Sequence, residues 1–196
     1  MRSPLAFDHV GENRYRESHG LWYDDFDVGD VIEHRPGRTV TAADNTFMSL
    51  LSLNGHPLHI DEEYARETEF GRVVVSSLVT LSLVGGMTTA GTSARSIANL
   101  GWDEIRLHTP VFVDETIYAE TTVVGKRPSK SRPHAGIVTF ESRGLKSDGT
   151  VFMTFRRSAL IPLNAEAAQA GSADSQRADS RPAGSRPADA QESQGS

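Results

Sequence analysis

One apolar stretch constrains this chain more than any other feature: residues 73–90 read VVVSSLVTLSLVGGMTTA, without a charged side chain. Periodicity alone does not assign such a run to helix or strand. Its length, and the Gly85–Gly86 pair near its end, favour a buried helix of about four turns over Val74–Thr89. The rest of the chain has to surround this helix, because it is apolar on all sides.

Four strand-like segments follow the helix, and turn residues separate them. In the second segment Ile117, Ala119, Thr121 and Val123 alternate with more polar neighbours, as in a half-exposed strand. Asp148–Gly149 predicts a tight hairpin between the last two segments. The predicted strands are Ile97–His108, Glu115–Lys126, Gly136–Lys146 and Val151–Ile161.

The region before the long helix combines one strand with a helix. The pattern predicts a strand over Val31–Val40 and then a helix over Thr41–Ser52. Thr41 suits the N-cap position, and Asp44 suits the first helical turn. The apolar residues of this helix follow the i, i+3, i+4 spacing of an amphipathic helix: Phe47, Leu50 and Leu51.

Asn54–Gly55 and Pro57 break this helix, and Asp61 caps a second short helix over Glu62–Glu67. The order of elements indicates one α+β domain over residues 21–163, with a helical segment overhanging one end. A curved antiparallel sheet wrapped around one long apolar helix is the hotdog arrangement. Such a sheet leaves an edge uncovered, so we expect a homodimer or a larger homo-oligomer.

The two ends of the chain differ from this domain. Residues 1–20 are mixed and polar, and we predict that they form an irregular arm. Residues 165–196 contain no Val, Ile, Leu, Met, Phe, Trp or Tyr, so they cannot bury an apolar surface. We therefore predict that residues 164–196 form a disordered low-complexity tail.

The composition argues against several functions. The chain has no cysteine, which excludes disulfides, thiolate metal sites and a cysteine nucleophile. The net charge is −6 and no long basic run occurs, so nucleic acid and anionic membranes are not expected as partners. No apolar run reaches the roughly 18 residues that a membrane span needs, and the N-terminus lacks a signal-peptide pattern. We therefore expect a cytoplasmic protein.

The stretch Asn54-Gly55-His56-Pro57-Leu58-His59 carries the clearest chemical signal. A proline-stiffened turn after a helix can hold the side chains of Asn54 and His59 toward one pocket. The ordinary pKa of histidine, about 6.5, suits proton transfer near neutral pH. A loop with one hydrogen-bonded histidine fits the same spacing. No clustered third ligand follows His56 and His59, so the pattern does not favour a metal site.

This stretch resembles the D-x-N-P-x-H signature of MaoC-like, (R)-specific enoyl-CoA hydratases. FGRVVVSS, residues 70–77, is similar to the F-G-x-x-I-x-H-G entry into the central helix of that family. PVFVDET, residues 110–116, resembles its P-V-x-x-G-D-T turn. The resemblance covers residues 21–163 and implies the hotdog fold. ANLGWDEIRLHTPVF and SKSRPHAGIVTFESRG look most like the mesaconyl-CoA and itaconyl-CoA hydratase branch.

Four residues depart from the family pattern. Asn54 stands where the family has its catalytic Asp, His56 stands where Asn is usual, and Ser76–Ser77 replaces His-Gly at the helix entry. In the family mechanism the Asp and His hold a water, take its proton and return a proton to the α-carbon. An amide can orient water but cannot accept its proton.

This departure leaves three alternatives. His59 acts as the sole base with Asn54 as its positioner, a carboxylate such as Asp44 or Asp61 takes over, or the chain binds acyl thioesters without turnover. We adopt the first, because a branch that normally carries Asn at this position would retain activity.

The thioester carbonyl needs a hydrogen-bond donor when negative charge builds on its oxygen. Free N–H groups at the start of the long helix can supply it, and the resemblance assigns this role to the backbone of Ser77, beside Ser76. An ordinary helix cap with small packing residues fits Ser76–Ser77 equally well. Candidates for binding substrate anions are Arg72, Arg106, Arg132 and His134. Arg132 and His134 belong to the basic stretch KRPSKSRPH, which can meet the CoA phosphates or form a solvated hairpin loop.

Together these residues predict an acyl-CoA hydratase/dehydratase for a short, branched or dicarboxylic enoyl-CoA such as mesaconyl-CoA or itaconyl-CoA. His59, Asn54 and Ser77 are the predicted catalytic residues, and the predicted substrate-binding residues are Arg72, Ser76, Arg132 and His134. No metal or redox cofactor is expected, because CoA arrives as part of the substrate. The alternatives are a non-catalytic acyl-CoA or acyl-carrier binder and a hotdog thioesterase. A thioesterase typically needs a carboxylate on or near the long helix, and Val74–Thr89 has none.

Overall fold

The computed structural model describes residues 5–164 of the 196-residue chain. The chain divides into two compact units, Met1–Leu163 and Asn164–Ser196, and the fold below is that of the first unit. Disorder is predicted for residues 164–196. Of these residues only Asn164 lies within the described range, so the prediction concerns residues outside it. In chain order the elements are β1 (Leu5–Gly11), β2 (Arg14–His19), η1 (Tyr23–Asp25), β3 (Val31–Thr39), α1 (Ala42–Leu51), η2 (Pro57–His59), α2 (Glu62–Arg66), α3 (Ser77–Thr92), β4 (Ala98–Leu107), β5 (Thr116–Pro128), β6 (Ala135–Lys146) and β7 (Val151–Pro162).

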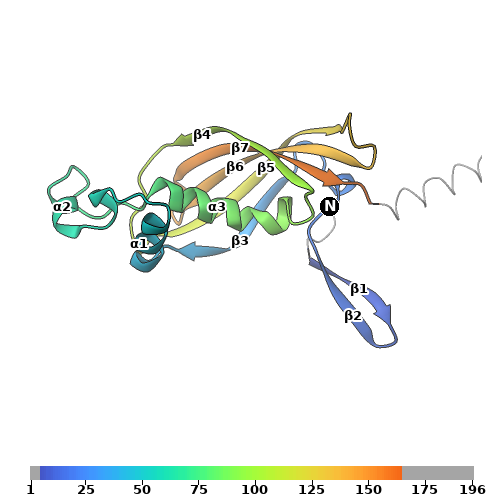
Figure 1. Cartoon of the computed structure of the whole chain (residues 1–196), viewed down its shortest axis with the longest axis horizontal. Helices are drawn as coiled ribbons and strands as arrows, with labels where there is room; N and C mark the ends of the chain where they lie inside the picture. Colours follow the sequence, from blue (N-terminus) through green and yellow to red (C-terminus); the bar gives the residue numbers. More distant parts are fainter. Residues whose placement is uncertain (1–4, 165–196) are drawn as a thin grey trace, which may run out of the picture. The chain divides into compact units, whose positions relative to one another are not determined.

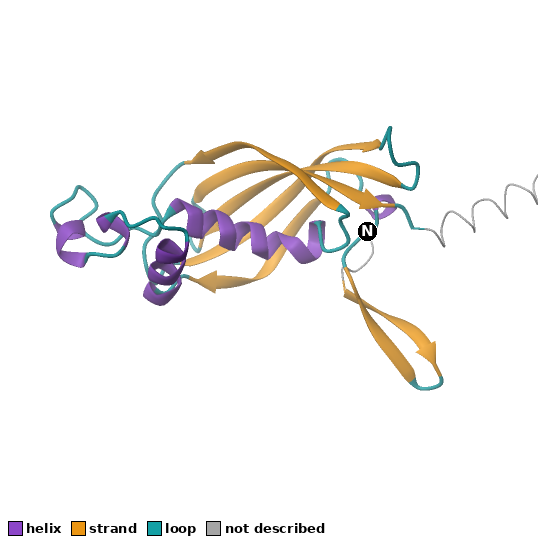
Figure 2. Ribbon diagram, in the orientation of Figure 1, coloured by secondary structure: helices purple, strands orange, loops and turns teal. Residues whose placement is uncertain are grey.

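A five-stranded antiparallel sheet in the order β3-β5-β6-β7-β4 curves around α3 (Figures 1 and 2). Val79 and Val84 of α3 share the main hydrophobic core with Ile117, Phe152 and Phe155 of the sheet. The short elements α1, η2 and α2 lie beyond one end of α3, as the predicted helical overhang (Figure 1). The α+β hotdog arrangement expected from the sequence is confirmed.

Helix α3 begins at Ser77 instead of the predicted Val74. Val74 forms a β-bridge with Phe112, and the N–H of Val75 donates to the carbonyl of Val111 at 2.8 Å. This pairing keeps the backbone extended up to Ser76, so the helix can start only after it. Within residues 5–164 no helix, α3 included, is long and apolar enough to cross a membrane.

The strand predictions for the second half of the chain are confirmed to within two residues at each end. In β5 the residues Ile117, Ala119, Thr121 and Val123 are fully buried, whereas the residues between them are partly exposed. The β6–β7 hairpin turns at Gly149, whose φ of +86° lies in the left-handed region that favours glycine.

Both predicted helix caps are confirmed. The hydroxyl of Thr41 accepts the N–H of Asp44 at 3.1 Å, and the carboxylate of Asp44 accepts the N–H of Thr41 at 2.9 Å. At the start of α2 the carboxylate of Asp61 accepts the N–H of Tyr64 at 3.1 Å. These reciprocal bonds fix the ends of the overhanging segment.

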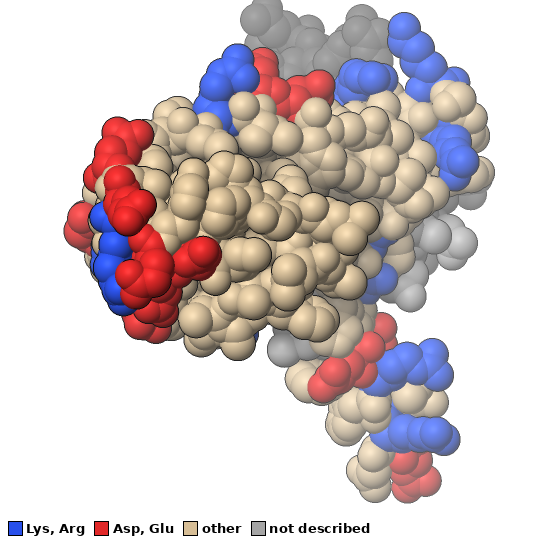
Figure 3. All heavy atoms as spheres, turned by 60° about the vertical axis from the view of Figure 1, so that its left-hand side comes forward, with Lys and Arg blue, Asp and Glu red and all other residues tan. Residues whose placement is uncertain are grey.

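The amphipathic helix α1 turns its polar side inward. Phe47 and Leu51 are 67% and 66% exposed, whereas Asn45 and Ser49 are 1% and 0% exposed. Figure 3 shows a broad uncharged surface bordered by clustered acidic side chains. Apolar side chains gathered on a surface commonly mark an interaction site, and the homo-oligomer expected from the sequence stays a prediction.

The irregular arm predicted for residues 1–20 is wrong, because β1 and β2 form an antiparallel hairpin. Aromatic or β-branched residues, which favour strands, occur on either side of a Gly-Glu-Asn turn: Phe7, Val10 and Tyr15. Asn13 adopts the left-handed conformation with φ +51°, which Asn tolerates well. The rings of His9 and Tyr15 then meet edge to face across the strands, with centroids 5.3 Å apart.

Candidate active site

His59 ends the 3₁₀ turn η2, which Pro57 begins. His56 stabilises the turn, because its Nδ1 accepts the N–H of Leu58 at 3.2 Å. The His59 ring donates its Nδ1–H to the carbonyl of Val74 at 2.9 Å, since a carbonyl oxygen can only accept. In the neutral ring Nε2 then carries the lone pair, and no group of residues 5–164 forms a hydrogen bond with it; this is the form that a general base needs.

The N-terminus of α3 supplies the second part of the site. Ser76 is the buried N-cap residue, and no side chain of residues 5–164 caps the first N–H groups of the helix. Uncapped N–H groups carry the positive end of the helix dipole. The backbone N–H of Ser77, the first helical residue, is thus able to donate to a developing oxyanion.

A cavity of about 300 Å³ brings His59 and Ser77 together. The rest of its lining is mostly apolar: Phe70, Val74, Val75, Thr80, Leu107, His108, Thr109, Pro110, Val111 and Phe152. His59 also lines a second, more polar hollow of about 310 Å³, together with Arg72 and Asp114. The imidazole is therefore placed where an apolar cavity and a polar one meet.

Asn54 is joined to this site through the helix cap. Its Nδ2 donates to the hydroxyl of Ser76 at 3.1 Å. Asn54 does not belong to the lining of the cavity that holds His59 and Ser77. Its amide oxygen meets no protein donor within the described range, so it can accept a hydrogen bond from a bound molecule. Two of the three predicted catalytic residues thus share one cavity, and the third contacts the residue before Ser77.

Neither carboxylate considered as a replacement base lies in that cavity. Asp44 accepts hydrogen bonds from the backbone and the hydroxyl of Thr41, and these bonds, with Arg38 at 2.6 Å, lower its pKa. Asp61 caps α2. Both carboxylates are used at helix N-termini, so the structure gives no support to the alternative in which one of them replaces the family Asp.

Arg72 lines the polar hollow that His59 also lines. Its guanidinium carbon lies 3.8 Å from the centroid of the Phe112 ring and its Nη2 lies 3.9 Å from the carboxylate of Glu115. Its side chain is 59% exposed, which leaves donors free for an anion. Arg72 therefore lies on the same hollow as His59, and its role in binding a substrate anion stays a prediction.

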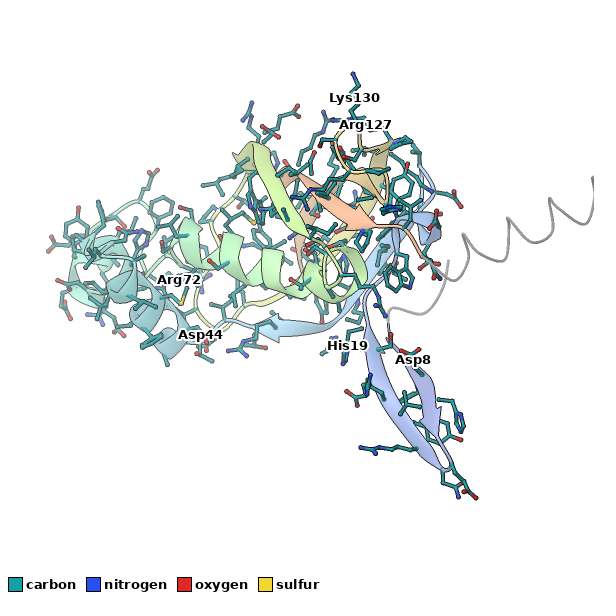
Figure 4. All side chains as sticks on the ribbon, turned by 45° about the vertical axis from the view of Figure 1, so that its right-hand side comes forward. Asp8, His19, Asp44, Arg72, Arg127 and Lys130 are labelled. Carbon is teal, nitrogen blue, oxygen red and sulfur yellow. The ribbon has the colours of Figure 1, made fainter. Side chains whose placement is uncertain are left out.

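Arg132 and His134 do not lie near His59, and their assignment to the same substrate site within one chain is wrong. They follow β5, whose 13 residues span roughly 40 Å at about 3.3 Å per residue. Figure 4 shows Arg127 and Lys130 of this basic segment at the end of the sheet opposite Arg72. The fourth candidate, Arg106, lies on the edge strand β4 and donates to the neighbouring Ile105 carbonyl.

Two residues of the site escaped the sequence analysis. Asn45 is buried on α1, where the apolar spacing of Phe47 and Leu51 indicated the opposite face. Its i, i+4 spacing from Ser49 on a polar stripe was the available signal. His108 lines the same cavity as His59 and shares a hydrogen bond of 3.0 Å with the hydroxyl of Thr154. It lies directly after β4, where the sequence offered only a Thr-Pro turn.

His56 and His59 lie close together, with ring centroids 5.8 Å apart. The Nδ1 atom of each ring is engaged within the turn region, with the Leu58 N–H and the Val74 carbonyl respectively. Among residues 5–164 no group of three or more His, Cys, Asp or Glu side chains is arranged to hold a metal ion.

The sequence matches one protein family and is similar to several curated enzymes. The sequence model of the family described as mesaconyl-CoA hydratase matches residues 2–194. The mesaconyl-CoA hydratase of Cereibacter sphaeroides is 31% identical over 151 residues, which are 77% of this chain and 44% of that protein. The chain spans about half the length of the curated mesaconyl-CoA hydratases that it matches.

Solved structures with a similar fold include a MaoC-like dehydratase and a double hotdog protein. A MaoC-like dehydratase from Rhodospirillum rubrum superposes with a TM-score of 0.66 at 28% identity, covering 74% of this chain and 99% of that one. A Mycobacterium tuberculosis protein described as a double hotdog fold superposes with a TM-score of 0.66 at 23% identity, covering 74% of this chain and 45% of that one. The second likeness concerns the fold alone.

Proposed function

Because this chain belongs to the mesaconyl-CoA hydratase family, within the MaoC-like hotdog hydratases, we propose that it is an acyl-CoA hydratase/dehydratase. The observation that supports this most directly is the cavity shared by the free Nε2 face of His59 and the uncapped N-terminus of α3. A base and an oxyanion donor on one cavity are what addition of water to an α,β-unsaturated thioester requires.

In the proposed reaction Nε2 of His59 takes a proton from water while the water oxygen bonds to the β-carbon. The π electrons of the double bond move toward the thioester, and the negative charge on its oxygen is stabilised by the N–H of Ser77. The enolate then collapses, and the α-carbon takes the proton from His59. The sum is one water added across the double bond, and dehydration follows the same steps in reverse.

Asn54 serves in this scheme as an orienting residue and not as a base. Its Nδ2 donates to the Ser76 hydroxyl, which leaves its oxygen able to accept a hydrogen bond. In this scheme the attacking water lies at the edge of the cavity, within reach of that oxygen. His59 is then the sole proton carrier of the addition, which accounts for a family site without its usual carboxylate. No metal or redox group is needed, because the thioester substrate brings its own CoA.

The substrate we propose is a short enoyl-CoA, branched or dicarboxylic, such as mesaconyl-CoA or itaconyl-CoA. The apolar cavity suits a short carbon chain, and Arg72 at the polar hollow suits a free carboxylate. The curated hydratases named for such a substrate support this choice. A thioesterase is disfavoured, because α3 carries no Asp or Glu along its 16 residues.

The test is a panel of crotonyl-, mesaconyl- and itaconyl-CoA, with loss of enoyl absorbance and mass detection of the water adduct. A parallel assay for free thiol measures hydrolysis of the thioester. We expect a water adduct with at least one of the three and no thiol release above the buffer rate. CoA binding with neither product would contradict the proposal and favour a non-catalytic binder, and thiol release alone would favour a thioesterase.

A further inference from the structure

A buried amide on α1 connects the two halves of the site. The side chain of Asn45 is almost fully buried, with 1% of the residue exposed. Its Nδ2 donates to the carbonyl of His59 at 2.8 Å and to the carbonyl of Val74 at 3.4 Å. Its Oδ1 accepts the N–H of Ser76 at 2.9 Å. One side chain thus bonds to three backbone groups that belong to two separate segments.

Each of these backbone groups stands next to a reacting group. The first belongs to His59 itself, the second is the carbonyl that receives the imidazole Nδ1–H, and the third lies one residue before the N–H of Ser77. We propose that Asn45 is a positioning residue that fixes the imidazole of His59, and its tautomer, relative to the oxyanion donor. The catalytic role of Asn45 rests on the proposed function. Its effect on the orientation and tautomer of His59 rests only on the hydrogen bonds described above.

The chemistry of the three partners requires an amide. Two carbonyls need donors and one N–H needs an acceptor, and a carboxamide offers both on one planar group. An aspartate would keep the acceptor for Ser76 but would turn an oxygen toward the carbonyls of His59 and Val74. The bond from His59 to Val74 would then lose the support that holds this carbonyl in place.

A matched control lies one turn further along the same helix. Ser49 is fully buried like Asn45, but its hydroxyl has no hydrogen-bond partner among the described residues. Removal of that hydroxyl changes a buried side chain of α1 without touching any bond to the site. Ser49→Ala therefore separates disturbance of the helix from loss of the amide.

The experiment measures the ring nitrogens of His59 by long-range ¹H–¹⁵N correlation, and kcat and KM for the preferred thioester. The proteins are the full-length wild type, Asn45→Asp, Asn45→Ser and Ser49→Ala. We expect one Nδ1–H tautomer in the wild type and in Ser49→Ala, and a mixture in Asn45→Asp. We also expect kcat to fall about 10- to 100-fold in Asn45→Asp, with KM changed by less than about threefold, as for a misplaced catalytic group.

An unchanged tautomer in a folded Asn45→Asp protein, or a kcat within about threefold of the wild type, would overturn the proposal. Loss of the fold in both Asn45 variants would also overturn it, because Asn45 would then be a folding residue. If the wild type hydrates none of the thioesters, the proposed function fails, and the ring-nitrogen signals still decide whether Asn45 positions His59.

Discussion

A buried histidine on β3 should control how the stability of this protein responds to mild acid. His34 is 6% exposed and shares a hydrogen bond of 2.9 Å with the hydroxyl of Thr121. Burial, and then the charges of Arg157 and Arg35, lower its pKa to about 4, although Glu120 acts in the opposite direction. The protein therefore folds around a neutral imidazole.

The size of the effect follows from the two pKa values. His34 becomes protonated below pH 6.5 in the unfolded chain, but only below about pH 4 in the folded protein. Stability is thus complete above pH 6.5 and is lost as the pH falls through this window. The full difference corresponds to about 3 kcal/mol, of which about 2 kcal/mol is lost by pH 5.

The test compares the wild type with His34→Gln, in which the amide can still bond to Thr121 but does not titrate. Urea unfolding at pH 7.5 and pH 5 gives the free energy of unfolding for both proteins. We expect the wild type to lose about 2 kcal/mol more than the variant between the two pH values. Other groups titrate in both proteins, so their contributions cancel in the difference.

Equal losses in the two proteins would refute the reasoning, because they would mean that His34 binds its proton equally well in the folded state. A larger loss in His34→Gln would refute it as well. A lower overall stability of His34→Gln does not by itself affect the test, because only the loss between pH 7.5 and pH 5 is compared between the two proteins.

Two further predictions test the site and the packing of α3. Asn54→Asp places a carboxylate beside the uncapped N-terminus of α3, so we expect about 0.3 to 1 kcal/mol of added stability at pH 7. Thermal melts should show that this gain disappears near pH 3, where the carboxylate is protonated. A gain that persists at pH 3 would contradict the assigned position of residue 54. Gly86→Ala adds a methyl group into open space within α3 and should stabilise by about 0.5 to 1 kcal/mol. In Gly85→Ala the new Cβ would lie 2.9 Å from the indole of Trp102, so we expect a loss of about 1 to 3 kcal/mol in the free energy of unfolding. Equal melting temperatures for the two variants would contradict the packing of Gly85 against Trp102.

Much of the fold follows from local patterns in the sequence. The alternation in β5 predicts its buried face, because a strand places successive side chains on opposite sides. Thr41 and Asp61 predict their caps, because short oxygen-bearing side chains satisfy the free N–H groups of the next turn. The start of α3 was missed, since the bridge of Val74 to Phe112 depends on a partner 38 residues away.

The candidate site was predictable only where a short motif carried it. His59 and Ser77 were predicted because the motif around each is compact in the sequence. Arg132 and His134 were misplaced, because the sequence does not show at which end of the long strand β5 the turn with His59 lies. Asn45 was missed for a different reason: apolar spacing drew attention to Phe47 and Leu51, whereas the polar side of α1 faces inward.

The central claim is that His59 is the base of a water addition, and one comparison tests it most directly. Hydration rates of the preferred enoyl-CoA are measured at pH 7 for the wild type, His59→Ala and His56→Asn. His56→Asn serves as the control, because Asn keeps an acceptor for the N–H of Leu58 and His56 does not line the cavity. We predict that His59→Ala loses about 100- to 10,000-fold in kcat while His56→Asn stays near the wild-type rate. A His59→Ala protein that is folded and still hydrates at the wild-type rate would contradict the account.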